Sequence, residues 1–376
     1  MRRRADCDDR RYLRAAVRLG RRHEGLTADN PSVGCLLIRD GRIVGSGVTG
    51  VGGRPHAEIV ALGEAGDAAR GATAYVSLEP CAHYGRSPPC AEALVRARVS
   101  RVVTALRDPF QRVNGLGIAK LREAGVEVAI VSEPTLVAMT RDGMAGFLSR
   151  IERKRPYVIL KLAVSTEGWL GRAGEEVAIT GRVARRYTHL LRARADGIVV
   201  GVGTVLADNP SLTCRLPGMA ARSPRRYVLD TQLRTPPAAQ VVLSAEEIPT
   251  TILVGEAVDP ERPGASASES ADLALDVAPM GDGSDRGISR VLERVFADGV
   301  GVLMVEGGAS VARSFLDAGV VDEIHLLLGR SIRDDPSAAS PIASPILGDQ
   351  VPSGFQFVRE LELGQDRAVV LRRTDV

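Results

Sequence analysis

The chain has 376 residues, of which 44% are hydrophobic and 25% are charged, and its formal net charge is +3. At about 150 residues per domain, this length favours two or three domains, each long enough to bury its own core. No run approaches the ~18 apolar residues that cross a membrane, and residues 1–22 lack the apolar stretch and cleavage site of a secretory signal, so we expect a cytoplasmic protein with no membrane partner.

The net charge hides an asymmetry along the chain. Residues 1–155 hold 26 basic and 17 acidic side chains, whereas the remaining residues hold 23 and 29. A basic half can indicate a nucleic-acid partner, but the aromatic content is only 3%, too low to supply a stacking surface for single-stranded bases. A solvated surface or a pocket for a phosphorylated small substrate explains the bias better, so we expect no nucleic-acid partner.

The first half alternates helical and strand patterns. Apolar residues at helical spacing predict an amphipathic helix over 9–20, and Asp40-Gly41 between two apolar runs predicts a hairpin of strands over 35–38 and 43–48. Strands that alternate with helices indicate an α/β layer fold. The further patterns predict helices over 56–66, 91–97 and 118–124, and strands over 74–78, 102–106 and 126–131.

The densest chemical pattern runs from His56 to Cys90. One imidazole and two thiols, those of His56, Cys81 and Cys90, form a zinc ligand set that leaves the fourth tetrahedral position open to water. At a helix start, Glu58 would turn toward the same pocket without being a ligand. Zinc deaminases of nucleobases use this arrangement, with zinc-bound hydroxide as nucleophile and the glutamate as proton carrier. The pattern therefore predicts a catalytic zinc site in which Glu58 is the catalytic residue.

Alternatives stay open for this pattern. The two cysteines could be buried free thiols, or the metal could be structural, although a structural zinc usually has four protein ligands and no use for Glu58. Cys90 follows Cys81 by nine residues instead of the commoner three, and the extra residues form a loop that carries His83 and Arg86. With five cysteines in all, a reducing compartment fits better than a disulfide framework. Asn30, ahead of Pro31, is either a heterocycle ligand or a turn residue.

A charged segment, residues 147–156, ends in Pro156, and we place a domain boundary there, between domains over 1–150 and 156–376. A second α/β pattern follows. Segments 259–285 and 331–344 are rich in small and turn-forming residues and predict surface excursions. The remaining patterns predict strands over 157–164, 197–200, 226–230 and 300–305, and helices over 182–194 and 309–318.

The second half carries weaker chemical signals. Gly201-Val202-Gly203-Thr204 and Glu306-Gly307-Gly308 each follow a predicted strand, where the backbone can approach a phosphate closely. Structural turns explain each glycine pair, taken alone, better than a phosphate site does, and the G-x-G-x-x-G fingerprint is absent. A polar loop, residues 208–215, adds a suggestion of a site. This half is therefore a candidate dinucleotide or phosphate binder whose reaction stays open.

Together these motifs resemble the family of bifunctional riboflavin-biosynthesis enzymes. The resemblance lies in residues 30–35, 55–58, 79–90, 191–193, 204–215 and 305–308. It implies an N-terminal cytidine-deaminase-like α/β/α domain followed by a dihydrofolate-reductase-like α/β domain, assembled as a homo-oligomer. It also implies two reactions on a phosphorylated pyrimidine: zinc-dependent hydrolysis of the 2-amino group of 2,5-diamino-6-ribosylamino-4(3H)-pyrimidinone 5′-phosphate, and NADPH-dependent reduction of the ribosyl group to ribityl.

Site residues follow from the resemblance by position. His56, Cys81 and Cys90 would bind Zn²⁺, and Glu58 would carry the proton. The substrate would contact Asn30, His83 and Arg86 in the first half and Arg192, Leu212, Arg215 and Glu306 in the second. The residues implied for NADPH are Ala163, Thr204, Asp208 and Gly308.

The second half departs from the family pattern at a few positions. Thr166-Glu167 stands where Leu-Asp is usual, Glu176 and Ala178 replace a Ser and a Trp, and Leu328-Gly329-Arg330 lacks the expected Pro-Lys. A carboxylate repels a substrate phosphate by ~1 kcal/mol at ~4 Å even in water. The main alternative is therefore a monofunctional deaminase paralogue with an inactive or repurposed second domain. A nucleic-acid deaminase and a non-enzymatic metal-stabilised module are the remaining alternatives.

Overall fold

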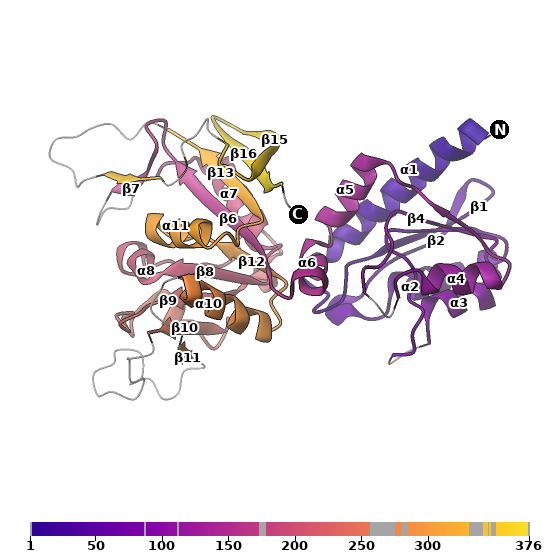
Figure 1. Cartoon of the computed structure of the whole chain (residues 1–376), viewed down its shortest axis with the longest axis horizontal. Coiled ribbons are helices and arrows are strands. Elements are labelled where there is room, and N and C mark those ends of the chain that lie inside the picture. The colour runs from indigo at the N-terminus through magenta and orange to yellow at the C-terminus, as the bar shows by residue number, and fades with distance from the viewer. Residues whose placement is uncertain are drawn as a thin grey trace. The chain divides into compact units, whose positions relative to one another are not determined.

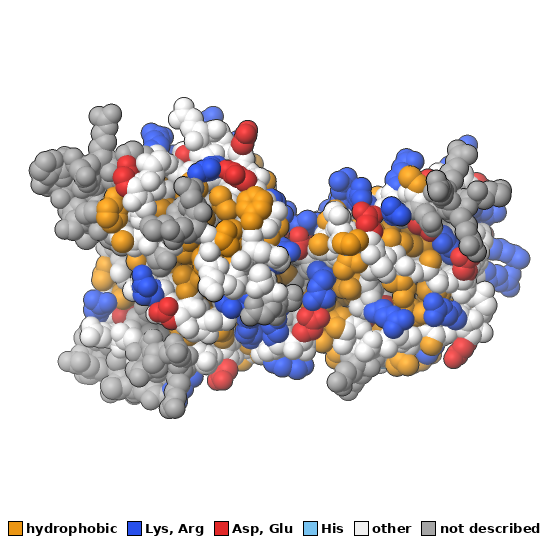
Figure 2. Space-filling view, turned by 45° about the horizontal axis from the view of Figure 1, so that its top comes forward, with side chains coloured by type: hydrophobic (Ala, Val, Ile, Leu, Met, Phe, Trp, Pro, Cys, Tyr) orange, Lys and Arg blue, Asp and Glu red, His pale blue; other side chains and the backbone are white. Residues whose placement is uncertain are grey.

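A computed structural model describes residues 2–85, 88–110, 113–172, 178–255, 275–279, 285–330, 341–344, 346 and 351–374 (Figure 1). The chain divides into two compact units, Met1–Lys154 and Arg155–Val376, and this division falls within the charged segment 147–156. Among the described residues, no helix is both long and apolar enough to span a bilayer. Basic, acidic and apolar side chains are interspersed on the face of both units seen in Figure 2, as on an ordinary solvated surface.

The first unit is built on a five-stranded sheet with the order β2-β1-β3-β4-β5. The predicted hairpin is confirmed, and its turn residues Asp40 and Gly41 have φ of 51° and 74°, as a two-residue type I′ turn requires. The parallel pairs β3–β4 and β4–β5 complete the sheet. The strands are β1 (Gly34–Arg39), β2 (Arg42–Val48), β3 (Thr73–Val76), β4 (Arg101–Thr104) and β5 (Glu127–Ile130).

Helices cover both faces of this sheet, so the α/β/α layer prediction is confirmed. Because side chains alternate along a strand, Leu36 and Ile38 of β1 pack with α1 and α5, whereas Cys35 and Leu37 pack with the helices of the other face. The first face carries α1 (Arg2–Gly20) and α5 (Pro134–Asp142), and the second carries α2 (Ala57–Ala65), α3 (Cys90–Arg96), α4 (Leu116–Glu123) and α6 (Ala145–Arg153).

The second unit is built on a nine-stranded sheet with the order β11-β10-β9-β8-β12-β6-β13-β16-β15. All strand pairs are parallel from β11 to β13, and an antiparallel hairpin, β15–β16, completes one edge. The strands are β6 (Tyr157–Val164), β8 (Gly197–Gly201), β9 (Arg225–Leu229), β10 (Thr250–Val254), β11 (Leu275–Pro279), β12 (Val302–Val305), β13 (Glu323–Leu328), β15 (Phe355–Leu363) and β16 (Asp366–Arg373).

Two core clusters show that this sheet is also covered on both faces. Val205 of α8 and Val241 of α9 belong to one cluster, and Val291 of α10 and Phe315 of α11 belong to the other. The second unit is therefore a three-layer α/β fold. Its helices are α7 (Arg182–Arg192), α8 (Val202–Asp208), α9 (Gln240–Leu243), α10 (Asp285–Ala297) and α11 (Ala309–Asp317).

The predicted excursion over 259–285 is wrong in part. Residues 275–279 form β11, which pairs in parallel with β10 at the edge of the large sheet. The strand signal is the alternating Leu275-Asp276-Val277, which the surrounding Gly, Pro and Ser residues obscured. In the second excursion, β14 (Pro341–Ala343) pairs with β7 (Trp169–Arg172). The rest of both segments, apart from Asp285 at the start of α10, Ser344 and the neighbouring Ile346, lies outside the described residues.

Candidate active sites

The three expected zinc ligands lie together in the first unit. The donor atoms of His56, Cys81 and Cys90 all lie within 4.8 Å of one another. His56 Nδ1 is 3.3 Å from Cys90 Sγ and 3.6 Å from Cys81 Sγ. A tetrahedral Zn²⁺ with bonds of about 2.0–2.3 Å holds its ligand atoms roughly 3.5 Å apart. The spacing of these donors therefore fits a shared zinc ion with one coordination position left over.

Local structure explains why these residues converge. His56 is the N-cap residue of α2, and Cys90 is the first residue of α3. The α2 helix can sit close to the sheet because β2 carries glycine beneath it: a side chain at Gly47 would come within 2.1 Å of the Ala57 carbonyl oxygen. The N–H groups of the first turn of α2 favour negative charge nearby. The fold thus places the ligands where thiolates are stabilised.

Hydrogen bonds distribute charge unevenly among the three ligand side chains. Hydrogen bonds from Cys90 and His56 lower the pKa of the Cys81 thiol to about 4. The pKa of Cys90 is raised, first because its thiol donates to Cys81 and then because it is buried. The Cys90 backbone N–H also donates to Cys81 Sγ at 3.2 Å. A thiolate at Cys81 is therefore already favoured before a cation binds.

Glu58 lies in the first turn of α2 and is only 4% exposed. Burial raises the pKa of its carboxyl group to about 7. A carboxyl group in this range can both accept and release a proton near neutral pH. Glu58, two residues after His56, is therefore suited to proton transfer and not to metal ligation.

A cavity of about 210 Å³ opens beside the metal ligands, and its lining includes Asn30, Glu58 and His83. The Nδ1 atom of His83 is buried and has no hydrogen-bond partner among the described residues. The ring of His83 packs edge-on against Phe110, with centroids 6.1 Å apart. A buried polar atom without a partner is a candidate for binding a polar ligand. Arg86 lies outside the described residues.

Sequence reasoning missed the contribution of residues 107–153 to this cavity. Asp108, Phe110, Phe147 and Ile151 line it, and the last two come from α6. The carboxylate of Glu79 holds the backbone of residues 108–118 in place. It accepts hydrogen bonds from the backbone N–H groups of Asp108, Gly115 and Ile118 at 3.3, 3.0 and 3.1 Å. The only sequence signals were Glu79 next to Pro80-Cys81 and the turn-forming Asp108-Pro109.

The second unit has a cavity of about 1080 Å³ at the carboxyl ends of three adjacent parallel strands, β8, β12 and β6. Ligands of open α/β sheets usually bind at this edge. Gly201 and Gly307 let the chain pass close to α11, since a side chain on either would meet Val311 within 2.8 Å. The expected residues that line the cavity are Ala163, Arg192, Thr204, Asp208, Leu212, Arg215 and Gly308.

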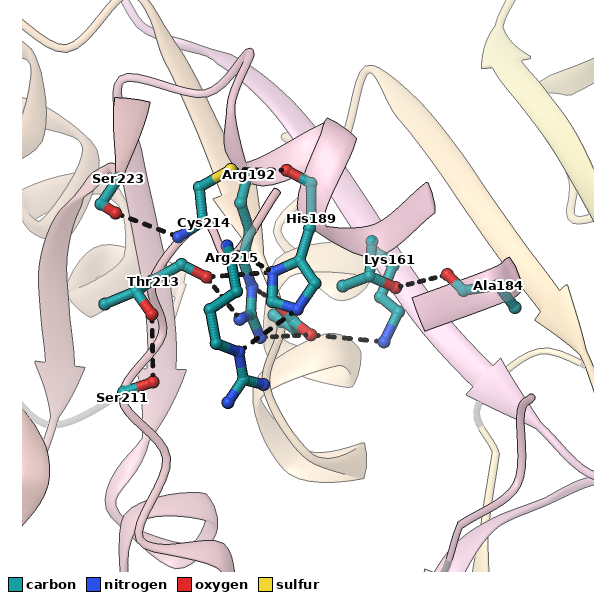
Figure 3. Close-up of polar contacts among 11 residues, drawn as sticks. Lys161, Ala184, His189, Arg192, Ser211, Thr213, Cys214, Arg215 and Ser223 are labelled. Carbon is teal, nitrogen blue, oxygen red and sulfur yellow. Dashed lines mark hydrogen bonds and ion pairs between the residues drawn. The ribbon is translucent and has the colours of Figure 1, made fainter. Parts of the chain in front are cut away.

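Glu306 is not among the residues that line this cavity, and it pairs with two cations that do, Lys161 and Arg192, both labelled in Figure 3. Arg192 donates to both of its carboxylate oxygens, at 2.9 and 3.0 Å, and Lys161 Nζ is 3.3 Å from Oε1. Although burial raises the pKa of Glu306, Arg192 and Lys161 outweigh it and lower the pKa to about 2. Sequence reasoning missed Lys161, although it is one of only three lysines among 49 basic residues.

Two of the unusual residues of this half can be placed. Glu167 is exposed on the turn between β6 and β7 and does not line the cavity. Ala178 does line it, so a larger side chain there would reduce the free volume. Glu176 lies outside the described residues. The carboxylate of Glu167 is therefore no obstacle to a phosphate in this cavity.

Comparison with known proteins covers both units. The RibD C-terminal domain family model matches residues 156–330, and the cytidine and deoxycytidylate deaminase zinc-binding region matches residues 7–106. Riboflavin biosynthesis protein RibD of Aquifex aeolicus is 34% identical over 97% of this chain and 98% of its own length. The Escherichia coli protein of the same name is 36% identical over 84% of this chain and 86% of its own.

Solved structures give the same result. Acinetobacter baumannii RibD, form 2, superposes with a TM-score of 0.82 at 32% identity, covering 98% of this chain and 100% of that one. The Thermotoga maritima diaminohydroxyphosphoribosylaminopyrimidine deaminase/5-amino-6-(5-phosphoribosylamino)uracil reductase superposes with a TM-score of 0.83 at 28% identity, covering 98% and 99%. The similarity therefore extends over both units.

Proposed function

Because the chain belongs to the RibD family of riboflavin biosynthesis proteins, we propose that each of its two units carries out one of the two reactions expected from its motifs. It is an enzyme with a zinc-dependent deaminase domain and an NADPH-dependent reductase domain. The relatives match both halves, which favours the bifunctional interpretation over a monofunctional deaminase paralogue. The grouping of His56, Cys81 and Cys90 around buried Glu58 supports the deaminase assignment most directly.

The proposed substrate of the first unit is 2,5-diamino-6-ribosylamino-4(3H)-pyrimidinone 5′-phosphate. Zn²⁺, when bound by His56, Cys81 and Cys90, supplies a Lewis acid that lowers the pKa of a coordinated water. Glu58 takes a proton from the attacking water and delivers it to the leaving amine, so the C2–N bond breaks, a C2–O bond forms and ammonia departs. Asn30 and His83 bind the heterocycle, because both line the same cavity as Glu58. Arg86 joins them on the resemblance alone.

The second unit is proposed to reduce the ribosyl group of the deaminated product, with the hydride supplied by NADPH. Gly308 is the N-cap residue of α11, where backbone N–H groups suit the cofactor's phosphates. A side chain on Gly308 would lie 3.8 Å from Thr204 Oγ1, so the two residues share one part of the cavity. Ala163 and Asp208 complete the proposed cofactor wall.

The phosphorylated end of the substrate is proposed to meet Arg215. Arg192 and Arg215 both line the cavity, but Arg192 already pairs with Glu306 through two hydrogen bonds. Arg215 donates to His189 at 3.4 Å and is exposed. Its guanidinium group is thus the better placed of the two for a phosphate. Arg192 and Leu212, which line the cavity, would contact the rest of the substrate beside Lys161. Glu306 joins them on the resemblance alone.

The two ligand thiols also favour a reducing compartment, since Cys81 and Cys90 must stay unpaired to bind a metal. We therefore keep a cytoplasmic location as part of the proposal. The homo-oligomer expected from the sequence stays a prediction, for light scattering of the purified chain to test.

The purified chain tests both assignments in one reaction. With the diaminopyrimidine substrate and NADPH, we expect release of ammonia followed by oxidation of NADPH that depends on prior deamination. Ammonia release without NADPH oxidation, even when the deaminated compound is supplied directly, would instead support a deaminase with a repurposed second domain.

A further inference from the structure

One wall of the 1080 Å³ cavity is a loop with an uncommon backbone conformation. Asp208, Asn209, Pro210, Ser211 and Leu212 all line the cavity. Asn209 has φ of 40° and Leu212 has φ of 55°, in the left-handed region that side chains with a Cβ rarely adopt. Such conformations persist only where the surrounding structure fixes them, and they gather at functional sites. Something must therefore hold this loop in place.

Arg226 of β9 holds the loop in place through hydrogen bonds from its buried guanidinium group. Its side chain is 0% exposed. Nη1 donates to the Ser211 carbonyl oxygen at 3.1 Å and to Ser244 Oγ at 2.8 Å, and Nη2 donates to the carbonyl oxygens of Ser244 and Ile248 at 2.9 and 2.8 Å. One guanidinium group thus ties the loop to the segment that follows α9.

Burying the Arg226 cation costs free energy, so this residue must make a contribution that offsets the cost. Burial lowers its pKa to about 10, so the group is still a cation at neutral pH. Its Nε atom is buried without a hydrogen-bond partner among the described residues. An apolar side chain would avoid both costs, because buried charges with incomplete partners rarely add net stability. We therefore expect Arg226 to act through the conformation of the loop that it holds, and not through a gain in stability.

Two further contacts complete the support of the loop. The Gln240 backbone N–H donates to Asn209 Oδ1 at 2.8 Å, and Gln240 itself lines the cavity at the start of α9. On the other side, Arg192 donates to the Thr213 carbonyl oxygen at 3.0 Å. The loop is therefore held between Arg226 and the residue that pairs with Glu306.

We propose that Arg226 is a positioning residue for the reductase reaction, which holds the loop 208–213 in the conformation that binds NADPH and the ribosyl phosphate without touching either ligand. This inference rests on the proposed function of the second unit. A lysine would keep the charge but not the planar fork that reaches two segments at once, so Arg226→Lys separates the geometry from the charge.

Tyr227→Phe is a matched control. Tyr227 is the next residue of the same strand, is equally buried and points to the opposite face, where its hydroxyl donates to Asp298 at 2.9 Å. Removing that hydroxyl perturbs the core of the same unit without touching the loop. Any effect specific to the loop should then appear only in the Arg226 variants.

The test measures NADPH binding by fluorescence titration and both KM values of the reductase reaction for Arg226→Lys, Arg226→Met and Tyr227→Phe, together with Tm. We expect the Kd and KM of NADPH and the KM of the pyrimidine to rise about tenfold or more in the Arg226 variants, with a smaller fall in kcat. Deamination by the same chain should be unchanged, and Tyr227→Phe should stay within twofold of wild type.

Two results would overturn the proposal: unchanged Kd and KM in Arg226→Lys, or an equal rise in Tyr227→Phe at a similar loss of Tm. If Arg226→Met does not fold, Arg226→Lys alone is compared with wild type and Tyr227→Phe. The binding titration remains informative if wild-type reduction is not observed, so failure of this inference is distinguishable from failure of the reductase assignment.

Discussion

Arg192 and Glu306 form a buried two-point ion pair, with Nε to Oε2 at 2.9 Å and Nη2 to Oε1 at 3.0 Å. The two residues are 114 positions apart, on α7 and just after β12. Lys161 of β6 adds a second cation on Oε1. A buried carboxylate with two cations is ionised at neutral pH, and both of its partners line the reductase cavity.

This pair makes the stability of the second unit sensitive to acid. In the folded state, Arg192 and Lys161 hold the pKa of Glu306 at about 2 in spite of burial, and His325 and Arg372 do the same for Glu323. Because the pKa of each carboxyl group is lower in the folded state, the unfolded chain takes up protons at a higher pH than the folded chain does. The stabilisation is therefore complete above about pH 4.5 and is lost as the pH falls toward 2.

Calorimetry between pH 7 and 3 checks this prediction. Glu306→Gln should lower the Tm of the second unit at pH 7 and flatten its decline with falling pH, because one of the two carboxylates no longer titrates. Glu293→Gln on the exposed side of α10 should follow wild type. An identical pH dependence of Tm in wild type and Glu306→Gln would show that the ion pair does not contribute.

Proton transfer by Glu58 is tested by an isosteric change. Glu58→Gln keeps the shape of the side chain but removes the carboxylate, so deamination should fall by about 10²–10⁴-fold or more, the contribution typical of a general acid–base. Zinc content measured by mass spectrometry should stay at one ion per chain, and NADPH oxidation with the deaminated compound should be unchanged.

Glu64→Gln supplies the control on the same helix. Glu64 is exposed and accepts hydrogen bonds from Ser46 at 2.7 and 2.8 Å, away from the metal ligands. Its deaminase activity should match wild type. Full activity in Glu58→Gln would remove Glu58 from the mechanism even if zinc is bound.

Metal removal should separate the two activities. A chelator that strips the ion from His56, Cys81 and Cys90 should abolish deamination and lower the Tm of the first unit, since a ligand that binds only the folded state stabilises it. Reduction of the deaminated compound should continue at the wild-type rate. Restoring Zn²⁺ should recover both the ammonia release and the Tm, and a persistent loss of the reductase rate would contradict independent sites.

The zinc site was predictable because its pattern is local. His56 and Glu58 sit two residues apart at one helix start, and the chemistry of Cys81 and Cys90 restricts the alternatives strongly. Lys161 was not predictable in this way, because its role depends on β6 pairing with β12, which sets Leu160 beside Val305 and brings Lys161 near Glu306. Strand order between distant segments leaves no signature in either segment alone.

Glu79 and β11 illustrate two further limits. Glu79 acts through backbone N–H groups 29 to 39 residues away, and such acceptors cannot be recognised from residue types. The β11 strand, Leu275–Pro279, is short and follows a Pro-, Gly- and Ser-rich segment. The composition of that segment led to the prediction of a surface excursion, although residues 275–277 alternate as in a strand. The helices that were predicted, by contrast, lie within a few residues of their expected bounds, except that α1 begins seven residues earlier. The helices α5, α6 and α10 were not predicted.

The wall of the deaminase cavity supplied by α6 should set affinity for the pyrimidine. Phe147 and Ile151 line the cavity of about 210 Å³, beyond residues 7–106 that match the deaminase zinc-binding region. Truncating a contact of this size removes about 1–3 kcal/mol of apolar contact with the substrate. Phe147→Ala should therefore raise the KM of deamination by about 10–100-fold, with zinc content unchanged. Leu116→Ala, at an exposed position of α4, should leave KM at the wild-type value, and an unchanged KM in Phe147→Ala would exclude Phe147 from substrate binding.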